Sequence, residues 1–191
     1  MKITAIYGSP REEGNTDLLL KGLVRGIREA GTEVTEIYLR KYRFSHCIEC
    51  GGCMDSGSCV LKDDMDKIYP HLKTAQVIVL SAPVFFYNVS ALTKAMIDRC
   101  QCFWAAKYLL HEPLSKVRGY KGKGILLSVG GSKGKKTFDG VLLTVRYFFD
   151  ALDMDFSHYL LYNPIDEKGM ICRHATAIQE AYDMGSAIVK Q

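Results

Sequence analysis

The sequence of 191 residues lacks any apolar run close to the length of a membrane span, which needs about 20 such residues. The apolar stretch within the opening MKITAIYGSPR is also far too short for the hydrophobic region of a signal peptide followed by a cleavage site. We therefore expect a cytoplasmic protein with no membrane partner.

Strong charge of either sign is also missing, because the net charge is only +4 and Lys and Arg are scattered along the chain. Nucleic-acid-binding domains concentrate basic residues on one face, so no nucleic-acid partner is expected. Internal repeats and low-complexity tracts are absent too. The balance of 48% hydrophobic and 24% charged residues is typical of a globular protein, and the length predicts a single domain over residues 1–191.

Short apolar runs alternate with helical patterns along the chain. Strands are predicted at Lys2 to Tyr7, Glu33 to Leu39, Gln76 to Ser81, Ile125 to Val129 and Phe156 to Leu161. Helices are predicted at Thr16 to Ala30, Ser90 to Arg99, Asp139 to Leu152 and His174 to Val189. This alternation predicts a doubly wound α/β fold, a five-stranded parallel sheet with helices on both faces. Two long irregular segments, at about 40–63 and about 102–123, are the places to look for function or an interface.

The first predicted strand ends in the loop Gly8-Ser9-Pro10-Arg11-Glu12-Glu13-Gly14-Asn15-Thr16. A loop that opens a helix offers backbone N–H groups to an anion. Here the hydroxyls of Ser9 and Thr16, the amide of Asn15 and the guanidinium of Arg11 add donors for a terminal phosphate. The loop matches neither G-x-x-x-x-G-K-[ST] nor G-x-G-x-x-G, so ATP and a Rossmann-bound dinucleotide are disfavoured. The alternative is an ordinary capped turn with a surface arginine.

Three motifs occur in order: GSPR-x-x-GNT after the first strand, SAPVFFYNVSALTKAMIDR after a central strand, and SVGGS after the next. Together they resemble the NADPH-dependent FMN reductase family of flavodoxin-like proteins. The resemblance implies a sheet in the order 2-1-3-4-5 and an FMN phosphate held by Ser9, Arg11, Asn15 and Thr16. It also implies that Pro83, Val84, Phe85, Phe86, Tyr87 and Asn88 border the ribityl chain and the isoalloxazine ring.

The expected topology agrees with that site, because strands 1 and 3 flank the point where strand order reverses, which is where flavodoxin itself binds FMN. The aromatic run alone would indicate an ordinary buried cluster. Its position after the central strand, which we expect Pro83 to end, favours the flavin crevice. Gly130 and Gly131 follow the next strand, where missing side chains let the backbone approach a ring, although a simple turn would also need them.

Four of the seven cysteines form the pattern C-x2-C-x2-C-x5-C, at Cys47, Cys50, Cys53 and Cys59. In a reducing compartment such a group indicates metal or redox chemistry before disulfides. A compact run with interspersed glycines suits a 4Fe-4S cluster. Structural zinc, which usually takes two separated C-x2-C pairs, is the alternative. The other cysteines, Cys100, Cys102 and Cys172, are expected to be buried or neutral thiols.

An FMN domain with this cysteine motif, followed by the helix start Asp63-Asp64-Met65, is similar to the iron-sulfur flavoprotein family of anaerobic archaea and bacteria. The resemblance implies one FMN and one 4Fe-4S cluster per subunit. It implies a flavin-dependent oxidoreductase that moves electrons between ferredoxin, or a similar carrier, and a small-molecule acceptor. It also implies a homodimer or homotetramer, for which the apolar segment from Phe103 to Leu110 offers a surface.

Two other functions stay open on the same fold. One is an NAD(P)H-dependent FMN, quinone or nitroaromatic reductase without a functional cluster. The other is a non-catalytic redox sensor or electron-transfer module. Lys94, Asp98 and Arg99, which follow the aromatic run, are expected to form a solvated helix face.

Overall fold

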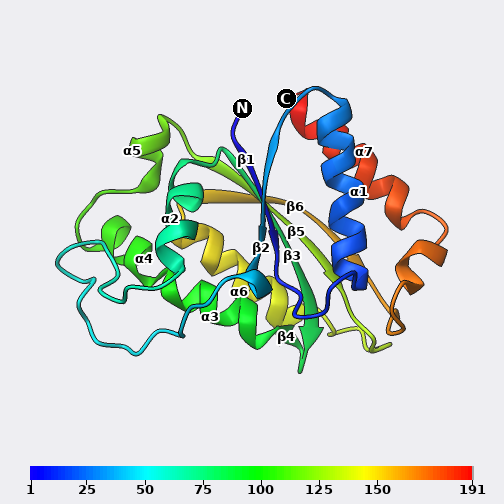
Figure 1. Cartoon of the computed structure of the whole chain (residues 1–191), viewed down its shortest axis with the longest axis horizontal. Coiled ribbons are helices and arrows are strands. Elements are labelled where there is room, and N and C mark those ends of the chain that lie inside the picture. Colours follow the sequence, from blue (N-terminus) through cyan, green and yellow to red (C-terminus); the bar gives the residue numbers. More distant parts are fainter. Residues whose placement is uncertain (191) are drawn as a thin grey trace.

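The computed structural model describes residues 1–190, so the last residue of the domain expected over 1–191 lies outside it. Five long strands form a parallel sheet at its centre (Figure 1). They are β1 (Ile3–Tyr7), β2 (Val34–Tyr38), β3 (Val77–Phe85), β5 (Gly122–Val129) and β6 (Met154–Tyr162). Their order is β2-β1-β3-β5-β6. The predicted doubly wound α/β class with a parallel sheet is therefore confirmed.

The prediction of five strands in the order 2-1-3-4-5 was wrong in the number of strands. A sixth, β4 (Asn88–Val89), pairs antiparallel with the end of β3, through Val84 with Val89 and Phe85 with Asn88. The sequence was misread at Pro83, which does not end the strand. Pro83 pairs with Val129 of β5, and β3 continues to Phe85 before the chain folds back. Proline removes only its own N–H donor, and the extended backbone on either side can still pair.

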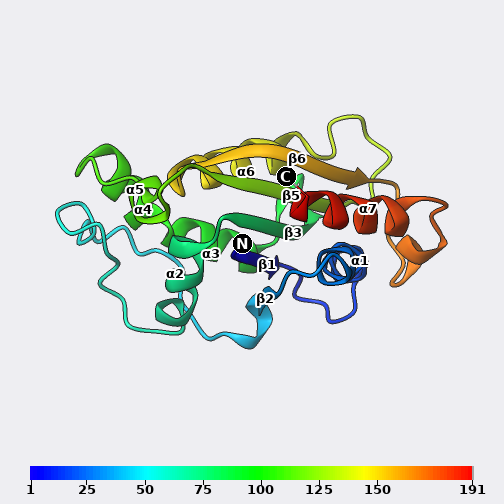
Figure 2. The same cartoon turned by 90° about the horizontal axis from the view of Figure 1, so that it is seen from above.

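Helices cover both faces of the sheet, as predicted (Figures 1 and 2). One face carries α1 (Asn15–Glu29) and α7 (Ala177–Val189). The other carries α2 (Met65–Thr74), α3 (Ala91–Arg99), α4 (Gln101–Tyr108), α5 (Leu114–Arg118) and α6 (Asp139–Ala151). Two short 3-10 helices, η1 (Leu39–Lys41) and η2 (Met170–Arg173), lie in connections. Among residues 1–190, none of the helices is long and apolar enough to cross a membrane.

The continuous apolar run of β3 places it at the centre of the sheet. Its alternate side chains enter two separate cores, Ile78 and Leu80 on the α2, α3 and α6 side and Val77 and Val79 on the α1 and α7 side. A strand buried on both faces cannot alternate apolar with polar residues. This explains why an unbroken apolar run predicted the central strand correctly.

The two segments predicted to be irregular have different outcomes. The chain between η1 and α2 contains neither helix nor strand, as expected. The segment at 102–123 was misjudged, because it contains most of α4 and all of α5. In α4 the exposed Trp104 and Tyr108 are as apolar as the buried Phe103, so the helical period is hidden. Phe103 packs edge-on against Tyr69 in the core, with ring centroids 5.5 Å apart, and so does not belong to an exposed interface.

Candidate functional site

The three segments predicted to hold the flavin lie at the carboxyl ends of β1, β3 and β5, on the same side of the molecule (Figure 1). The first, residues 8–16, is called the phosphate loop below. Its Gly8 N–H donates to the Ser81 carbonyl at 2.8 Å, and the Gly8 carbonyl accepts from the hydroxyls of Ser90 and Thr93, each at 2.9 Å. A Cβ at Gly8 would lie 2.2 Å from the Thr93 hydroxyl oxygen. Only glycine fits there, and it ties the loop to α3.

Ser9, Arg11 and Thr16 of the predicted phosphate set lie together around the start of α1. Ser9 and Thr16 are buried, whereas Arg11 is exposed. The Ser9 hydroxyl accepts from the Arg11 N–H at 3.1 Å, which curls the loop. The loop thus presents an exposed guanidinium beside the N-terminus of a helix, an arrangement that favours an anion.

Asn15 is the first residue of α1 and does not cap the helix. Gly14 is the N-cap residue of α1, and it offers no side-chain cap. The Asn15 amide nitrogen donates to the Glu167 carbonyl at 2.9 Å, and its oxygen accepts from the Ile171 N–H at 3.2 Å. Its side chain therefore joins the phosphate loop to the chain after β6, a long-range contact that the local sequence does not reveal.

A second arginine, Arg40, lies behind the phosphate loop and was missed in the sequence. Its guanidinium pairs with Asp17 at 2.9 Å, donates to the Ser9 carbonyl at 3.3 Å and lies over the Tyr38 ring. The Asp17 side chain is fully buried. Burial raises the pKa of Asp17, and the charge of Arg40 opposes this. Arg11 is therefore not the only cation next to the predicted phosphate position.

The aromatic loop at residues 83–88 forms a tight hairpin between β3 and β4. Phe86 and Tyr87 occupy the turn with φ of 48° and 62°, in the left-handed region that non-glycine residues rarely adopt. The Phe86 side chain is fully exposed, and those of Phe85 and Tyr87 are about half exposed at 49% and 55%. The ordinary alternative, a buried aromatic cluster, is excluded. Strained, exposed aromatic side chains at the carboxyl edge of a sheet are suited to a ligand or a partner.

Gly130 and Gly131 lie where β5 ends, next to the aromatic hairpin. A Cβ at Gly130 would lie 2.7 Å from the Thr137 side chain and 3.2 Å from that of Val84. A Cβ at Gly131 would lie 3.0 Å from the carboxylate of Asp166. Close packing between neighbouring loops is therefore sufficient reason for both glycines, and it holds the loop after β5 against the hairpin.

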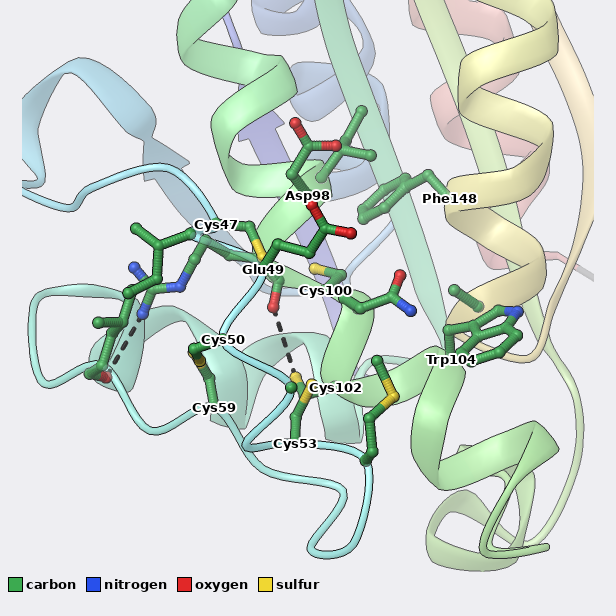
Figure 3. A pocket seen from close by; sticks show the side chains of 18 of the residues that line it. Cys47, Glu49, Cys50, Cys53, Cys59, Asp98, Cys100, Cys102, Trp104 and Phe148 are labelled. Carbon is green, nitrogen blue, oxygen red and sulfur yellow. Dashed lines mark hydrogen bonds between the residues drawn. The ribbon is translucent and has the colours of Figure 1, made fainter.

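All four cysteines of the predicted cluster motif line one cavity of about 1030 Å³ (Figure 3). They lie on the segment at residues 45–61, called the cysteine loop below, and the opposite wall is formed by α3, α4 and α6. Cys100 and Cys102 line the same cavity. Both are buried as expected, and burial raises the pKa of Cys102 to about 11, with the nearby Cys59 and Cys53 adding to the shift. Cys172 is exposed and lies elsewhere, on η2.

The sulfurs of the cysteine loop are not drawn together into a metal-binding arrangement. In the described part of the chain, no three or more His, Cys, Asp or Glu side chains are placed to hold a metal ion. The four thiols nevertheless share one electrostatic environment, because burial raises the pKa of Cys53 and the charges of Cys59, Cys47 and Cys50 raise it further. Gly51 and Gly57 turn the loop at φ of 72° and 62°. Four thiols on a glycine-turned loop fit the donor set of an iron-sulfur cluster.

Of the three charged residues of α3, only Lys94 and Asp98 lie on the solvated face that we expected. Lys94 and Asp98 do pair across one helical turn, at 2.7 Å. Arg99 instead is buried and pairs with Asp63 at the end of the cysteine loop, at 2.6 Å. The sequence gives no signal of this pairing, since the partner of Arg99 is 36 residues away.

Comparison with known proteins defines the class. The model of the family described as NADPH-dependent FMN reductase matches residues 1–157. A solved structure described as flavone reductase superposes with a TM-score of 0.75 at 18% identity, covering 100% of this chain and 62% of that chain, and so shares the fold. With this family match, the chain is a flavoprotein with a redox function, and its enzyme class is a flavin-dependent oxidoreductase.

Relatives of known sequence narrow the class further. An iron-sulfur flavoprotein of Methanosarcina thermophila is 31% identical over 172 residues, covering 87% of this chain and 85% of that protein. Another, from Methanocaldococcus jannaschii, is 42% identical over 99 residues, but the match spans only 52% of this chain and 51% of that protein. The chain belongs to the iron-sulfur flavoprotein family, within the NADPH-dependent FMN reductases of flavodoxin-like fold.

Proposed function

We propose that this protein binds FMN at the sheet edge and a 4Fe-4S cluster on the cysteine loop, and that it transfers electrons between a one-electron carrier such as ferredoxin and a small acceptor. When bound, FMN exchanges electrons singly or in pairs and the cluster exchanges one at a time, so the pair would convert between the two. The observation that carries the proposal is the gathering of four motif cysteines at one end of α3, while the phosphate loop is held at its other end.

The phosphate loop supplies the anchor in this proposal. Arg11 and the backbone N–H groups at the start of α1 would hold the FMN phosphate, with Ser9 and Thr16 nearby. Asn15 would act by fixing the loop through Glu167 and Ile171 rather than by touching the phosphate itself. The hydrogen bonds from Ser90 and Thr93 to the Gly8 carbonyl hold the start of the loop against α3.

The aromatic hairpin supplies the flavin wall. The ribityl chain and the ring would lie against the hairpin residues Pro83, Val84, Phe85, Phe86, Tyr87 and Asn88. Gly130 and Gly131, which follow β5, would complete this side of the flavin site. Exposed aromatic faces offer stacking surfaces for a planar ring, and burial of Phe86 on binding would remove a large apolar side chain from water. The strained turn is consistent with a hairpin whose shape serves a ligand rather than the stability of the fold.

The cysteine loop supplies the ligands for the cluster. Cys47, Cys50, Cys53 and Cys59 would each give one thiolate. The loop must tighten to do so, because the sulfurs are not in a chelating arrangement. Its glycines and its position outside the sheet allow such tightening.

The distance between the phosphate loop and the cysteine cavity supports electron transfer within one chain. α3 has nine residues, and a helix rises about 1.5 Å per residue, so its ends are roughly 13 Å apart. The phosphate loop is bound at its first turn, and Arg99 and Cys100 at its other end line the cysteine cavity. A neighbouring subunit is therefore not required to bring the two regions within one helix length.

Cofactor content tests the proposal. Anaerobically reconstituted protein should hold about one FMN and about four irons per chain, as a cubane requires. Cys50→Ala should lose the cluster and keep the FMN, whereas Cys172→Ala, which removes an exposed thiol outside the motif, should keep both. Full iron content in Cys50→Ala, or none in wild type, would refute the cluster.

The second candidate is an NAD(P)H-dependent flavin, quinone or nitroaromatic reductase without a functional cluster. The description of the matched family, NADPH-dependent FMN reductase, favours it. On this account the cysteine cavity would hold no iron after reconstitution, and NADPH alone would reduce the flavin.

We also propose a homodimer or homotetramer as the working assembly. The candidate surface is the apolar group at the end of α4, where Trp104, Tyr108 and Leu109 are 37%, 44% and 47% exposed and where Trp104 and Tyr108 also form the rim of the cysteine cavity. Light scattering of the wild type and of Trp104→Asp tests it, since a charge in the centre of such a contact should shift the mass towards the monomer.

A further inference from the structure

Arg99 is the largest of the fully buried side chains in the described part of the chain, and its position is unusual for a cation. It lies at the last residue of α3, with a side chain that is 0% exposed. Burying a guanidinium costs several kcal/mol unless it is fully paired. Asp63 provides that pairing with both oxygens, at 2.6 Å and 3.1 Å from the two terminal nitrogens. Such two-point pairing fixes orientation as well as charge.

The same guanidinium joins the two ends of the cysteine loop. It donates to the carbonyl of Ser45 at 3.0 Å and to the carbonyl of Leu61 at 3.4 Å. Ser45 comes two residues before the first motif cysteine, and Leu61 comes two residues after the last. Asp63 adds a further link by accepting from the Ser45 N–H at 3.1 Å. Arg99 therefore closes the loop at its base.

The Arg99 guanidinium also faces the motif itself. Burial acts to lower the pKa of Arg99, but its hydrogen bonds with Asp63, with a smaller contribution from the nearby Cys59 side chain, hold it above its usual value. Arg99 and Cys59 line the same cavity. Among the described residues, the buried Nε–H of Arg99 has no partner. A buried donor without an acceptor is uncommon and calls for an explanation, because its lost hydrogen bond to water is not replaced.

We propose that Arg99 is the positioning residue of the iron-sulfur site, closing the cysteine loop for cluster binding and donating a hydrogen bond to the Cys59 sulfur. The inference rests on the proposed function, since it presumes that the loop binds a cluster. Hydrogen bonds to cluster sulfurs and nearby positive charge favour the reduced, more negative state and so raise the reduction potential. The residue would thus both hold the site together and set its potential.

The test compares Arg99→Gln and Arg99→Lys in the full chain after anaerobic reconstitution. The midpoint potential of the cluster is followed by electron paramagnetic resonance during a redox titration. Arg99→Gln should lower the potential relative to wild type. Arg99→Lys keeps a charged donor, so its potential should lie between those of Arg99→Gln and wild type. The matched control is Arg118→Gln, since Arg118 also binds backbone carbonyls, those of Leu152 and Asp153, but does not line the cysteine cavity.

A second measurement needs no cluster. In the reduced apoprotein, the rate at which a disulfide reagent modifies the motif thiols should rise several-fold in Arg99→Gln, because the loop has lost its closure, and should not rise in Arg118→Gln. Unchanged thiol rates together with an unchanged cluster potential in Arg99→Gln would overturn the inference. Loss of iron binding in Arg99→Gln, with FMN affinity retained, would support it.

The two measurements also separate this inference from the proposed function. If wild type takes up no iron, the cluster proposal and the potential-setting role fail together, and the thiol rates still decide whether Arg99 closes the loop. If wild type binds the cluster and both Arg99 variants match it in potential and thiol rate, the proposed function stands and the role of Arg99 is wrong.

Discussion

The hydroxyl of Ser90 lies 2.9 Å from the carbonyl oxygen of Gly8, so the helix that begins against the phosphate loop ends at the arginine that closes the cysteine loop. Ser90 is also the N-cap of α3, accepting from the Thr93 N–H at 3.3 Å. The buried Ser90 side chain therefore both caps α3 and binds the phosphate loop. The two candidate cofactor regions are mechanically linked through a single element of the core.

Ser90→Ala should remove both interactions. We expect the free energy of unfolding to fall by about 1–2 kcal/mol, because a cap and a buried hydrogen bond are lost. FMN affinity should fall as well, since the phosphate loop loses one of its two anchors on α3. The control is Ser186→Ala, whose hydroxyl bonds the Gly26 carbonyl on the other face of the sheet. Equal FMN affinity in Ser90→Ala and Ser186→Ala would show that the linkage has no role in binding.

Arg11→Ala should weaken FMN by about 1–2 kcal/mol, the range for a charge-assisted hydrogen bond reduced by solvent exposure. Riboflavin lacks the phosphate, so its affinity should not change. Isothermal titration with both ligands separates a phosphate contact from a general loss of shape. Arg25→Ala, an exposed arginine farther along α1, serves as the control. A parallel loss for FMN and riboflavin would contradict the assignment.

Phe86→Gly should stabilise the fold and weaken flavin binding. Glycine relieves the positive φ of 48°, which costs about 1–2 kcal/mol in a residue with a Cβ, and no buried surface is lost because Phe86 is fully exposed. Urea denaturation should therefore give a gain of about 1 kcal/mol after the entropy of glycine is subtracted. Phe86→Ala keeps the Cβ and should show no such gain. If both variants bind FMN like wild type, the hairpin is not the flavin wall.

Asp17 should give stability a measurable dependence on pH. Burial raises the pKa of its carboxyl in the folded chain, with Arg40 opposing, so the folded chain holds the proton more tightly than the unfolded chain. The stabilisation from this proton is fully present below the ordinary value of 3.8 and is lost as the pH rises through the folded pKa. Asp17→Asn has no such proton.

Denaturation in urea, from about pH 4 to about pH 7, tests this linkage. Over that interval the free energy of unfolding of wild type should fall more, or rise less, than that of Asp17→Asn. Identical pH dependence in the two proteins would show that burial does not perturb Asp17.

The sequence predicted the elements whose signal is local. Neighbouring residues alone carry the apolar run of β3, the helical period of α1 and the cysteine spacing. The structure contains the strand, the helix and a cavity that the four cysteines share. Arg40 was missed, and Arg99 was assigned to a solvated helix face, because neither has its carboxylate partner nearby in the sequence. Their partners, Asp17 and Asp63, are identified only once the chain is folded.

Pro83 and α4 show a different limit. A proline usually marks the end of a strand, but here pairing with β5 outweighs the loss of one donor. In α4 both the buried and the exposed positions carry apolar residues. The alternation of apolar and polar positions by which a helix is recognised in a sequence is therefore missing. Exposed apolar side chains are a reason to look for a partner, which is why the end of α4 carries the oligomer proposal.

On the proposed function, electrons reach the flavin through the cysteine loop. The most direct measurement is anaerobic rapid mixing of the reconstituted protein with reduced ferredoxin or with NADPH, followed by the flavin absorbance. We expect reduced ferredoxin to bleach the flavin absorbance of wild type rapidly and this reaction to be lost in Cys50→Ala. NADPH alone should bleach the flavin little. Fast bleaching by NADPH in both proteins, with ferredoxin-driven reduction unchanged in Cys50→Ala, would contradict the proposed function and favour the NAD(P)H-dependent reductase.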